Sequence, residues 1–145
     1  MEDLINAIIT ELQGTLTTVR ASAIWAAESL NPIIIPEFVT FPAVAVKDGR
    51  ETFAPGYQDG EEIERYVDVA ALVQVWKEGE AIVGADGVLR LYAAIRSALN
   101  DNTLSLSGYT LAVAESAGAS KTIFTETDMA QMKVLTLRYE ALSDY

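Results

Sequence analysis

The chain has 145 residues, of which half are hydrophobic and 21% are charged, a composition that indicates one folded domain over residues 1–145 rather than a disordered segment. It contains no cysteine and no histidine, which excludes disulfides, thiolate metal sites and the Ser-His-Asp and Cys-His catalytic arrangements. The net charge is −11 and the basic residues are scattered singly, which argues against tight nucleic-acid binding.

The N-terminal segment is predicted to be an amphipathic helix. Glu2 and Asp3 stand in its first turn, where the helix dipole favours anions and where a secretory signal would carry cations. No apolar stretch reaches the roughly 18 residues that a membrane span needs. We therefore expect a soluble, unexported protein. The apolar face of this helix comprises Leu4, Ile5, Ile8, Ile9, Leu12, Leu16 and Val19.

The next segments are short and separated by turn signals. Residues 22–29 fit one or two helical turns ended by Asn31-Pro32, and residues 33–35 are expected to be extended between prolines. Residues 41–47 (FPAVAVK) predict a strand that the turn dipeptide Asp48-Gly49 closes. Residues 50–62 are expected to form a long loop or a loose hairpin arm.

The clearest pattern is a strand followed by a helix. Residues 63–77 alternate with period two, and residues 85–100 carry apolar side chains at helical spacing. We expect this helix to pack on the odd-numbered face of the strand. The predicted contact cluster consists of Val69, Val73, Val75, Tyr92, Ile95 and Leu99.

The remaining chain predicts strands at 109–115, 121–124 and 129–141, with a turn over 116–120. In the last strand the apolar positions change face near Val134, which predicts either a bulge there or burial on both faces. Because strands joined by tight turns pair antiparallel, the predicted fold class is α+β: a mostly antiparallel sheet with two main helices packed on one face.

Candidate chemistry is sparse. An acidic run, Asp59, Glu61, Glu62 and Glu64, could hold a divalent cation or supply an acid-base pair, but it lacks the spacing of a calcium loop, and a solvated loop is the favoured interpretation. A Ser120-Lys121 pair would point to opposite faces of a strand. We predict no catalytic residue, no metal and no cofactor. Tyr66, Trp76 and Tyr109 are candidates for subunit contacts, since Tyr and Trp are enriched at interface hot spots.

The order of these segments resembles that of the tail terminator proteins of long-tailed bacteriophages, the minor tail protein U-like group. The resemblance covers about residues 1 to 142. After the N-terminal helix, it rests on FPAVAVKDG, YVDVAALVQVW, VLRLYAAIRSALN, LSGYTLAVAES and MKVLTLRYEAL.

The resemblance implies a structural virion protein that forms a ring, commonly hexameric, on the last ring of the tail tube. Such a ring stops tube polymerisation, joins the tail to the head-side connector protein and lets DNA pass without specific binding. It implies a location in the tail and neck of the virion, and in the host cytoplasm during assembly. Within such a ring, we expect Asp59, Glu61, Glu62 and Glu64 to line the channel or face the tube. The alternatives are another neck or head-completion protein, an enzyme with a carboxylate-bound metal at residues 59–64, and a small soluble binding domain of bacterial origin.

Overall fold

The computed structural model describes residues 1–55, 60–75, 79–125 and 128–144. The fold is α+β, with a mostly antiparallel six-stranded sheet, as predicted. The helices are α1 (Glu2–Thr15), the 3-10 turn η1 (Ala21–Ala23), α2 (Glu80–Val83) and α3 (Val88–Leu99). The strands are β1 (Ile24–Ala26), β2 (Ala43–Pro55), β3 (Gly60–Gln74), β4 (Tyr109–Ala117), β5 (Lys121–Phe124) and β6 (Met129–Asp144).

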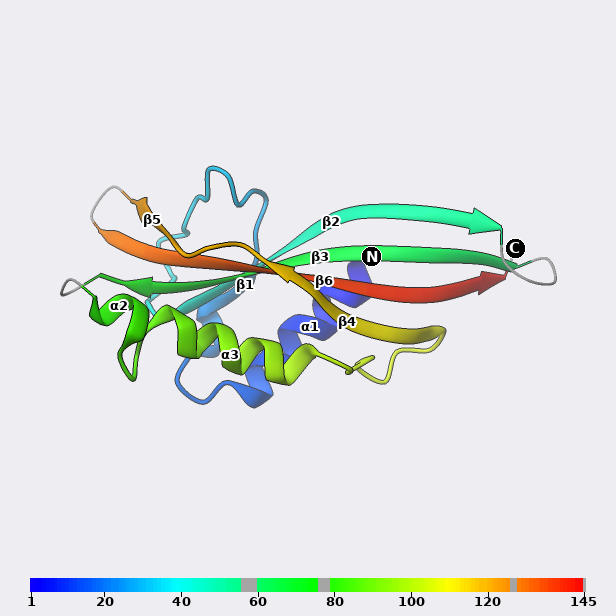
Figure 1. Ribbon diagram of the computed structural model, residues 1–145, viewed down its shortest axis with the longest axis horizontal. Helices are drawn as coiled ribbons and strands as arrows, with labels where there is room; N and C mark the ends of the chain where they lie inside the picture. Colours follow the sequence, from blue (N-terminus) through cyan, green and yellow to red (C-terminus); the bar gives the residue numbers. More distant parts are fainter. Residues whose placement is uncertain (56–59, 76–78, 126–127, 145) are drawn as a thin grey trace.

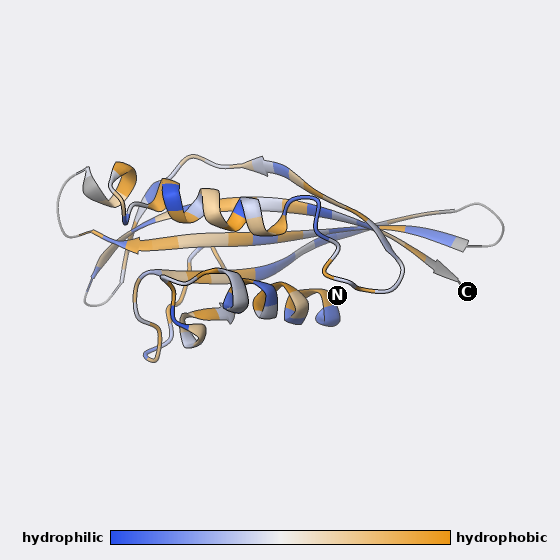
Figure 2. Cartoon of the chain, turned by 90° about the horizontal axis from the view of Figure 1, so that it is seen from below, coloured by the Kyte–Doolittle hydropathy of each residue, from blue (hydrophilic) through white to orange (hydrophobic). Residues whose placement is uncertain are grey.

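The sheet has the order β1-β2-β3-β6-β4, and β5 pairs with the other end of β6 (Figure 1). β1 runs parallel to β2, whereas the other pairs are antiparallel. β2, β3 and β6 continue past the helices to one end of the molecule (Figure 1). We call this extension the arm; it consists of residues 50–55, 60–66 and 138–144. Hydrophilic residues are visible on the arm in Figure 2.

One face of the sheet carries the main core. Directly opposite residues of antiparallel strands share a face, so Val69 of β3 lies beside Leu135 of β6 and Val46 of β2. On this face Lys133 lies over the ring of Tyr92, with its Nζ 4.9 Å from the ring centroid, which places α3 on the same face. We call it the helix face.

The predicted helix-strand cluster is confirmed. Its buried members are Val69, Val73, Ile95 and Leu99, and Val75 and Tyr92 pack against them half-buried. The same core includes Leu4, Ile8 and Leu12 of α1, which contacts α3, β1 and β2.

The opposite face is divided into two parts. At the α2 end it is buried and apolar, with Ala43, Ala45, Ala70, Leu72 and Met132 all at most 1% exposed. Partly buried apolar residues of the segment between β1 and β2 pack against the same core: Ala27, Leu30, Ile33, Ile35 and Phe41. Toward the arm, the same face becomes polar.

This division explains why the apolar positions of β6 change face. Met132 points to the opposite face and Leu135 points to the helix face, and both are buried. β6 therefore buries apolar residues on both faces of the sheet. The bulge that residue 134 suggested is not in the β3–β6 ladder, which keeps one register from Gly60↔Asp144 to Gln74↔Ala130. Register shifts occur instead where β4 pairs with β6.

Asp48-Gly49 is not a hairpin turn. β2 passes through these residues to Pro55, and its register with β3 shifts between Asp48 and Glu51, which adds one residue to β2. A Cβ on Gly49 would lie 2.7 Å from the backbone oxygen of Tyr66. Glycine is therefore needed for the close approach of two strands at a bulge, and the predicted turn is wrong.

Three other predicted boundaries are corrected by the structure. β2 runs on to Pro55 and β3 begins at Gly60, so the two strands form a paired hairpin arm, the second of the two alternatives predicted for residues 50–62, and not a long loop. Residues 22–29 form no α-helical turns: residues 22–23 end η1, residues 24–26 form β1 because β2 offers a parallel partner, and residues 27–29 belong to no helix or strand. The predicted helix over 85–100 is α3, which begins at Val88 after the separate turn α2.

The end of α3 is fixed to β4 just after Leu99, close to the end at residue 100 that the sequence predicts. The Asp101 backbone N–H donates to the Ala112 oxygen at 3.0 Å, and Asn100 Oδ1 accepts from the Ala114 N–H at 3.0 Å. These bonds occupy part of the outer edge of β4. In the part of the chain that the structure describes, no helix is long and apolar enough to cross a membrane.

Candidate functional site

The polar face of the arm gathers charged residues from three strands around one arginine. Arg138 Nε of β6 donates to Glu115 Oε2 of β4 at 2.9 Å, and its Nη1 contacts Glu140. Its Nη1 also lies 3.9 Å from Glu64 Oε1 of β3. The carboxylates converge here because Glu64 and Glu140 are directly opposite each other in the β3–β6 ladder.

A second set of contacts extends this cluster toward β2. Glu64 Oε2 accepts from the hydroxyl of Tyr66 at 3.1 Å and from Thr52 Oγ1 at 3.3 Å. The guanidinium of Arg50 stacks over the Tyr66 ring, 4.3 Å from its centroid. The outer half of the opposite face is thus a continuous polar surface across four strands, which we call the polar face.

The hydrogen bond to Glu115, with the charges of Glu115, Glu140 and Glu64, raises the pKa of Arg138 above its ordinary value, so Arg138 stays charged. The carboxylates around it are 36–41% exposed, which means that water screens these pairs. Exposed ion pairs contribute about 0–1 kcal/mol each. The cluster therefore determines which charges the arm presents more than it stabilises the fold.

The helix face of the arm holds an internal aromatic cluster. Arg65 Nη1 donates to the Tyr109 hydroxyl at 2.6 Å, and Arg65 Nε lies 3.6 Å from Glu51 Oε2. Burial alone would lower the pKa of Arg65, but the Tyr109 hydrogen bond and the Glu51 charge raise it. Tyr109 also meets Tyr139 edge to face, with ring centroids 6.2 Å apart. Tyr109, proposed from the sequence as a subunit contact, is thus engaged within its own chain.

Tyr139 is one of the aromatic residues that the sequence offers as protein contacts, with core packing as the favoured role for each alone. Its side chain is fully buried, and its hydroxyl has no hydrogen-bond partner among the described residues. Burial raises its pKa above the ordinary value, with a smaller contribution from Tyr109. The only sequence signal was its apolar alternation with Leu135 and Leu137, which indicated burial but not an unbonded hydroxyl.

The predicted acidic run is divided by the strand geometry. Glu61, Glu62 and Glu64 lie in β3, not in a loop, and successive strand residues point to opposite faces. Glu62 and Glu64 therefore belong to the polar face with Tyr66, whereas Glu61 points to the other side. Asp59 and Trp76 lie outside the described residues.

This division bears on the metal-enzyme alternative. Three or more acidic residues placed to hold a metal ion occur nowhere among the residues that the structure describes. Glu61 and Glu62 cannot act as a pair from opposite faces. Ser120 precedes β5 and Lys121 is its first residue; in the structure these two described residues make no hydrogen bond to each other.

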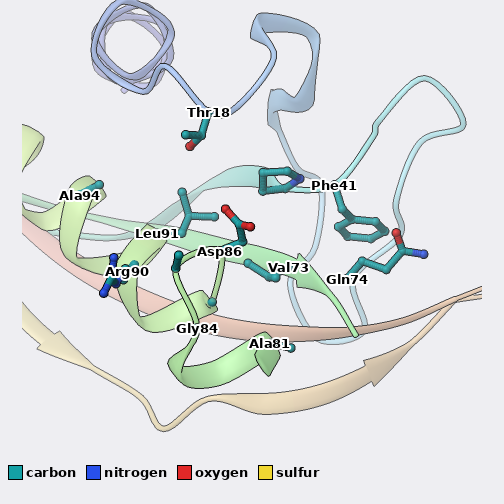
Figure 3. A pocket seen from close by; sticks show the side chains of 13 residues that line it. Thr18, Phe41, Val73, Gln74, Ala81, Gly84, Asp86, Arg90, Leu91 and Ala94 are labelled. Carbon is teal, nitrogen blue, oxygen red and sulfur yellow. The ribbon is translucent and has the colours of Figure 1, made fainter. Parts of the chain in front are cut away.

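A cleft of about 730 Å³ opens at the other end of the molecule. Thr18, Phe41 and Gln74 lie on one side, and Asp86, Arg90 and Leu91 line the other, at the start of α3 (Figure 3). Both charged residues are exposed to solvent. The cleft therefore offers no buried charge that would bind a small polar ligand selectively.

The sequence was compared with known proteins. No protein-family model matches the chain, and a search of curated proteins found no significant match.

Proposed function

We propose that this protein is a structural protein of a long-tailed bacteriophage virion that closes into a ring, most simply a hexamer, on the end of the tail tube. The ring ends tube polymerisation, joins the tail to the head-side connector protein and lets DNA pass through its channel. The protein has no enzymatic activity of its own in this proposal. The order of helices and strands resembles that of tail terminator proteins, and this resemblance first suggests the function.

The observation that carries the proposal is the arm. β2, β3 and β6 extend past the helices, and one side of this extension is a polar face against which no helix packs among the residues that the structure describes (Figure 1). We propose that both long helices cover the helix face, which leaves the polar face for a neighbouring subunit. A ring-forming subunit needs such a surface, because it must contact the next copy outside its own core.

The charge balance supports a channel role. A net charge of −11 on each copy, repeated around an axis, creates a negative potential that keeps DNA phosphates from adhering. We propose that the arm tip with Glu61 faces the channel or the tube, while Glu62 and Glu64 face the neighbouring subunit with Tyr66.

Electron microscopy of assembled tails tests the ring. The proposal expects the labelled protein as one ring at the head-side end of each tail. A single copy per tail, or labels scattered along the tube, would contradict it.

Reversing the charge of Glu61 tests the tip. Glu61→Lys is expected to slow DNA ejection or to block capping without unfolding the protein, because it places a cation where phosphates pass. Circular dichroism provides the folding control. Infectious particles with normal ejection kinetics would show that Glu61 has no such role.

A further inference from the structure

The outer surface of α3 has the opposite charge to the rest of the molecule. Its exposed residues are Leu89, Arg90, Ala93, Ala94, Arg96 and Ser97, which we call the α3 stripe. Residues 88–99 contain two arginines and no carboxylate, although the whole chain has 21 acidic residues against 10 basic ones. Asp86 and Asp101 lie just beyond the two ends of the helix.

The two arginines of the stripe have no acidic partner in the part of the chain that the structure describes. No ion pair joins Arg90 or Arg96 to any residue in the described ranges. Between them Ala93, Ala94 and Ser97 are exposed and short, so another surface can approach the helix backbone closely. A protein of strongly negative charge thus presents one unpaired basic helix face.

The polar face is the complementary surface. Its carboxylates outnumber its cations: Glu62, Glu64, Asp68, Glu115 and Glu140 stand against Lys47, Arg50 and Arg138. Glu62 is exposed and makes no ion pair with another described residue. Beside it on β6, Leu142 is 50% exposed and supplies an apolar contact.

We propose that the polar face of one copy packs against the α3 stripe of the next copy, with Glu62 and its neighbouring carboxylates opposite Arg90 and Arg96. This inference rests on the proposed ring and names its subunit contact. The two surfaces lie on opposite faces of the same sheet, because α3 covers the helix face. A contact between different surfaces of identical subunits is heterologous, and such contacts produce a ring when the rotation closes. A two-fold dimer would need one surface that complements itself.

Charge reversal and its rescue test the contact by sedimentation velocity of the purified protein. Glu62→Lys/Glu115→Lys and Arg90→Glu/Arg96→Glu are each expected to weaken self-association at least about tenfold, because like charges then face each other. The chain that carries all four substitutions is expected to recover association. The exposed controls Glu28→Lys/Glu37→Lys and Lys121→Glu should leave it unchanged, and circular dichroism checks the fold.

The absence of cysteine gives a second readout that does not depend on affinity. A Glu62→Cys/Arg96→Cys chain treated with a short bismaleimide is expected to give a ladder of covalent oligomers that ends at the ring. Each single cysteine variant should give no ladder, because a heterologous contact joins residue 62 of one copy to residue 96 of the next.

Three results would overturn the proposal. The first is the absence of a ladder from the double-cysteine chain at the highest concentration the protein tolerates. The second is a four-fold variant that associates no better than either charge-reversed parent. The third is an Arg90→Glu/Arg96→Glu chain with normal association but reduced retention on DNA-cellulose, which would make the stripe a DNA-facing surface. A ladder from a chain that fails to cap tubes would refute the proposed function and leave this contact standing.

Discussion

Replacing Tyr139 by Phe removes one oxygen from a fully buried side chain and leaves its ring packing in place. The Tyr139 hydroxyl has no hydrogen-bond partner among the described residues. A buried hydroxyl without a partner costs about 1–3 kcal/mol relative to its hydration in the unfolded chain. We therefore expect Tyr139→Phe to raise the free energy of unfolding by about 1 kcal/mol, although most core substitutions lower it.

The adjacent tyrosine provides a matched control of opposite sign. Tyr109 contacts the Tyr139 ring, but its hydroxyl accepts a 2.6 Å hydrogen bond from Arg65 Nη1. Tyr109→Phe should therefore lower the free energy of unfolding by about 1.5–3 kcal/mol, the range for a hydrogen bond to a charged group. Urea denaturation followed by tryptophan fluorescence measures both. A loss above about 1 kcal/mol for Tyr139→Phe would mean that its hydroxyl is bonded and that the packing described for the arm is wrong.

The other predictions concern the core, the bulge and alkaline pH. Ile95→Ala should lower the free energy of unfolding, measured by urea denaturation, by about 2–5 kcal/mol. Ser97→Ala, at an exposed position of the same helix, should change it by less than about 0.5 kcal/mol. A loss below about 0.5 kcal/mol for Ile95→Ala would refute the assigned face of α3. Gly49→Ala should destabilise the fold by about 1–3 kcal/mol, because its Cβ would meet a backbone carbonyl of β3 at 2.7 Å. Gly14→Ala, which meets nothing within 4 Å in α1, should stabilise it by about 0.5–1 kcal/mol, so equal effects at the two glycines would contradict the bulge. Burial raises the pKa of Tyr139, so the folded state holds a proton that the unfolded state releases above about pH 10. Above that pH the free energy of unfolding should fall by up to about 1.4 kcal/mol per pH unit because of Tyr139. In Tyr139→Phe this contribution to the pH dependence of stability should vanish.

The sequence predicted those parts of the fold in which periodicity and burial agree. β3 and α3 were identified because Val69, Val73, Ile95 and Leu99 repeat at strand and helix spacing, and all are buried in one core. The arm was predicted only as an alternative to a loop, because charged residues interrupt its apolar alternation, although Ile63 and Tyr139 on its helix face are buried. Residues 50–62 therefore fitted either a long loop or a loose hairpin arm.

Local signals were also overridden by pairing between distant segments. Asp48-Gly49 has the composition of a turn, but its glycine is needed because β2 passes close to Tyr66 at a bulge. Residues 24–26 lie in a segment that was predicted to be helical, yet they form a strand because the edge of β2 offers a parallel partner. The Arg138 cluster could not be predicted, since it depends on the register that brings Glu64 and Glu115 to the same arginine.

If this protein ends the growth of a tail tube, as proposed, then its presence should limit the length to which tubes grow. Purified tube protein is polymerised with and without this protein in substoichiometric amount, and tube lengths are measured by electron microscopy. We expect the mean length to fall in proportion to the added protein, with a ring at one end of each tube. Unchanged lengths and bare tube ends, with the protein folded and in excess of the ends, would contradict the proposal.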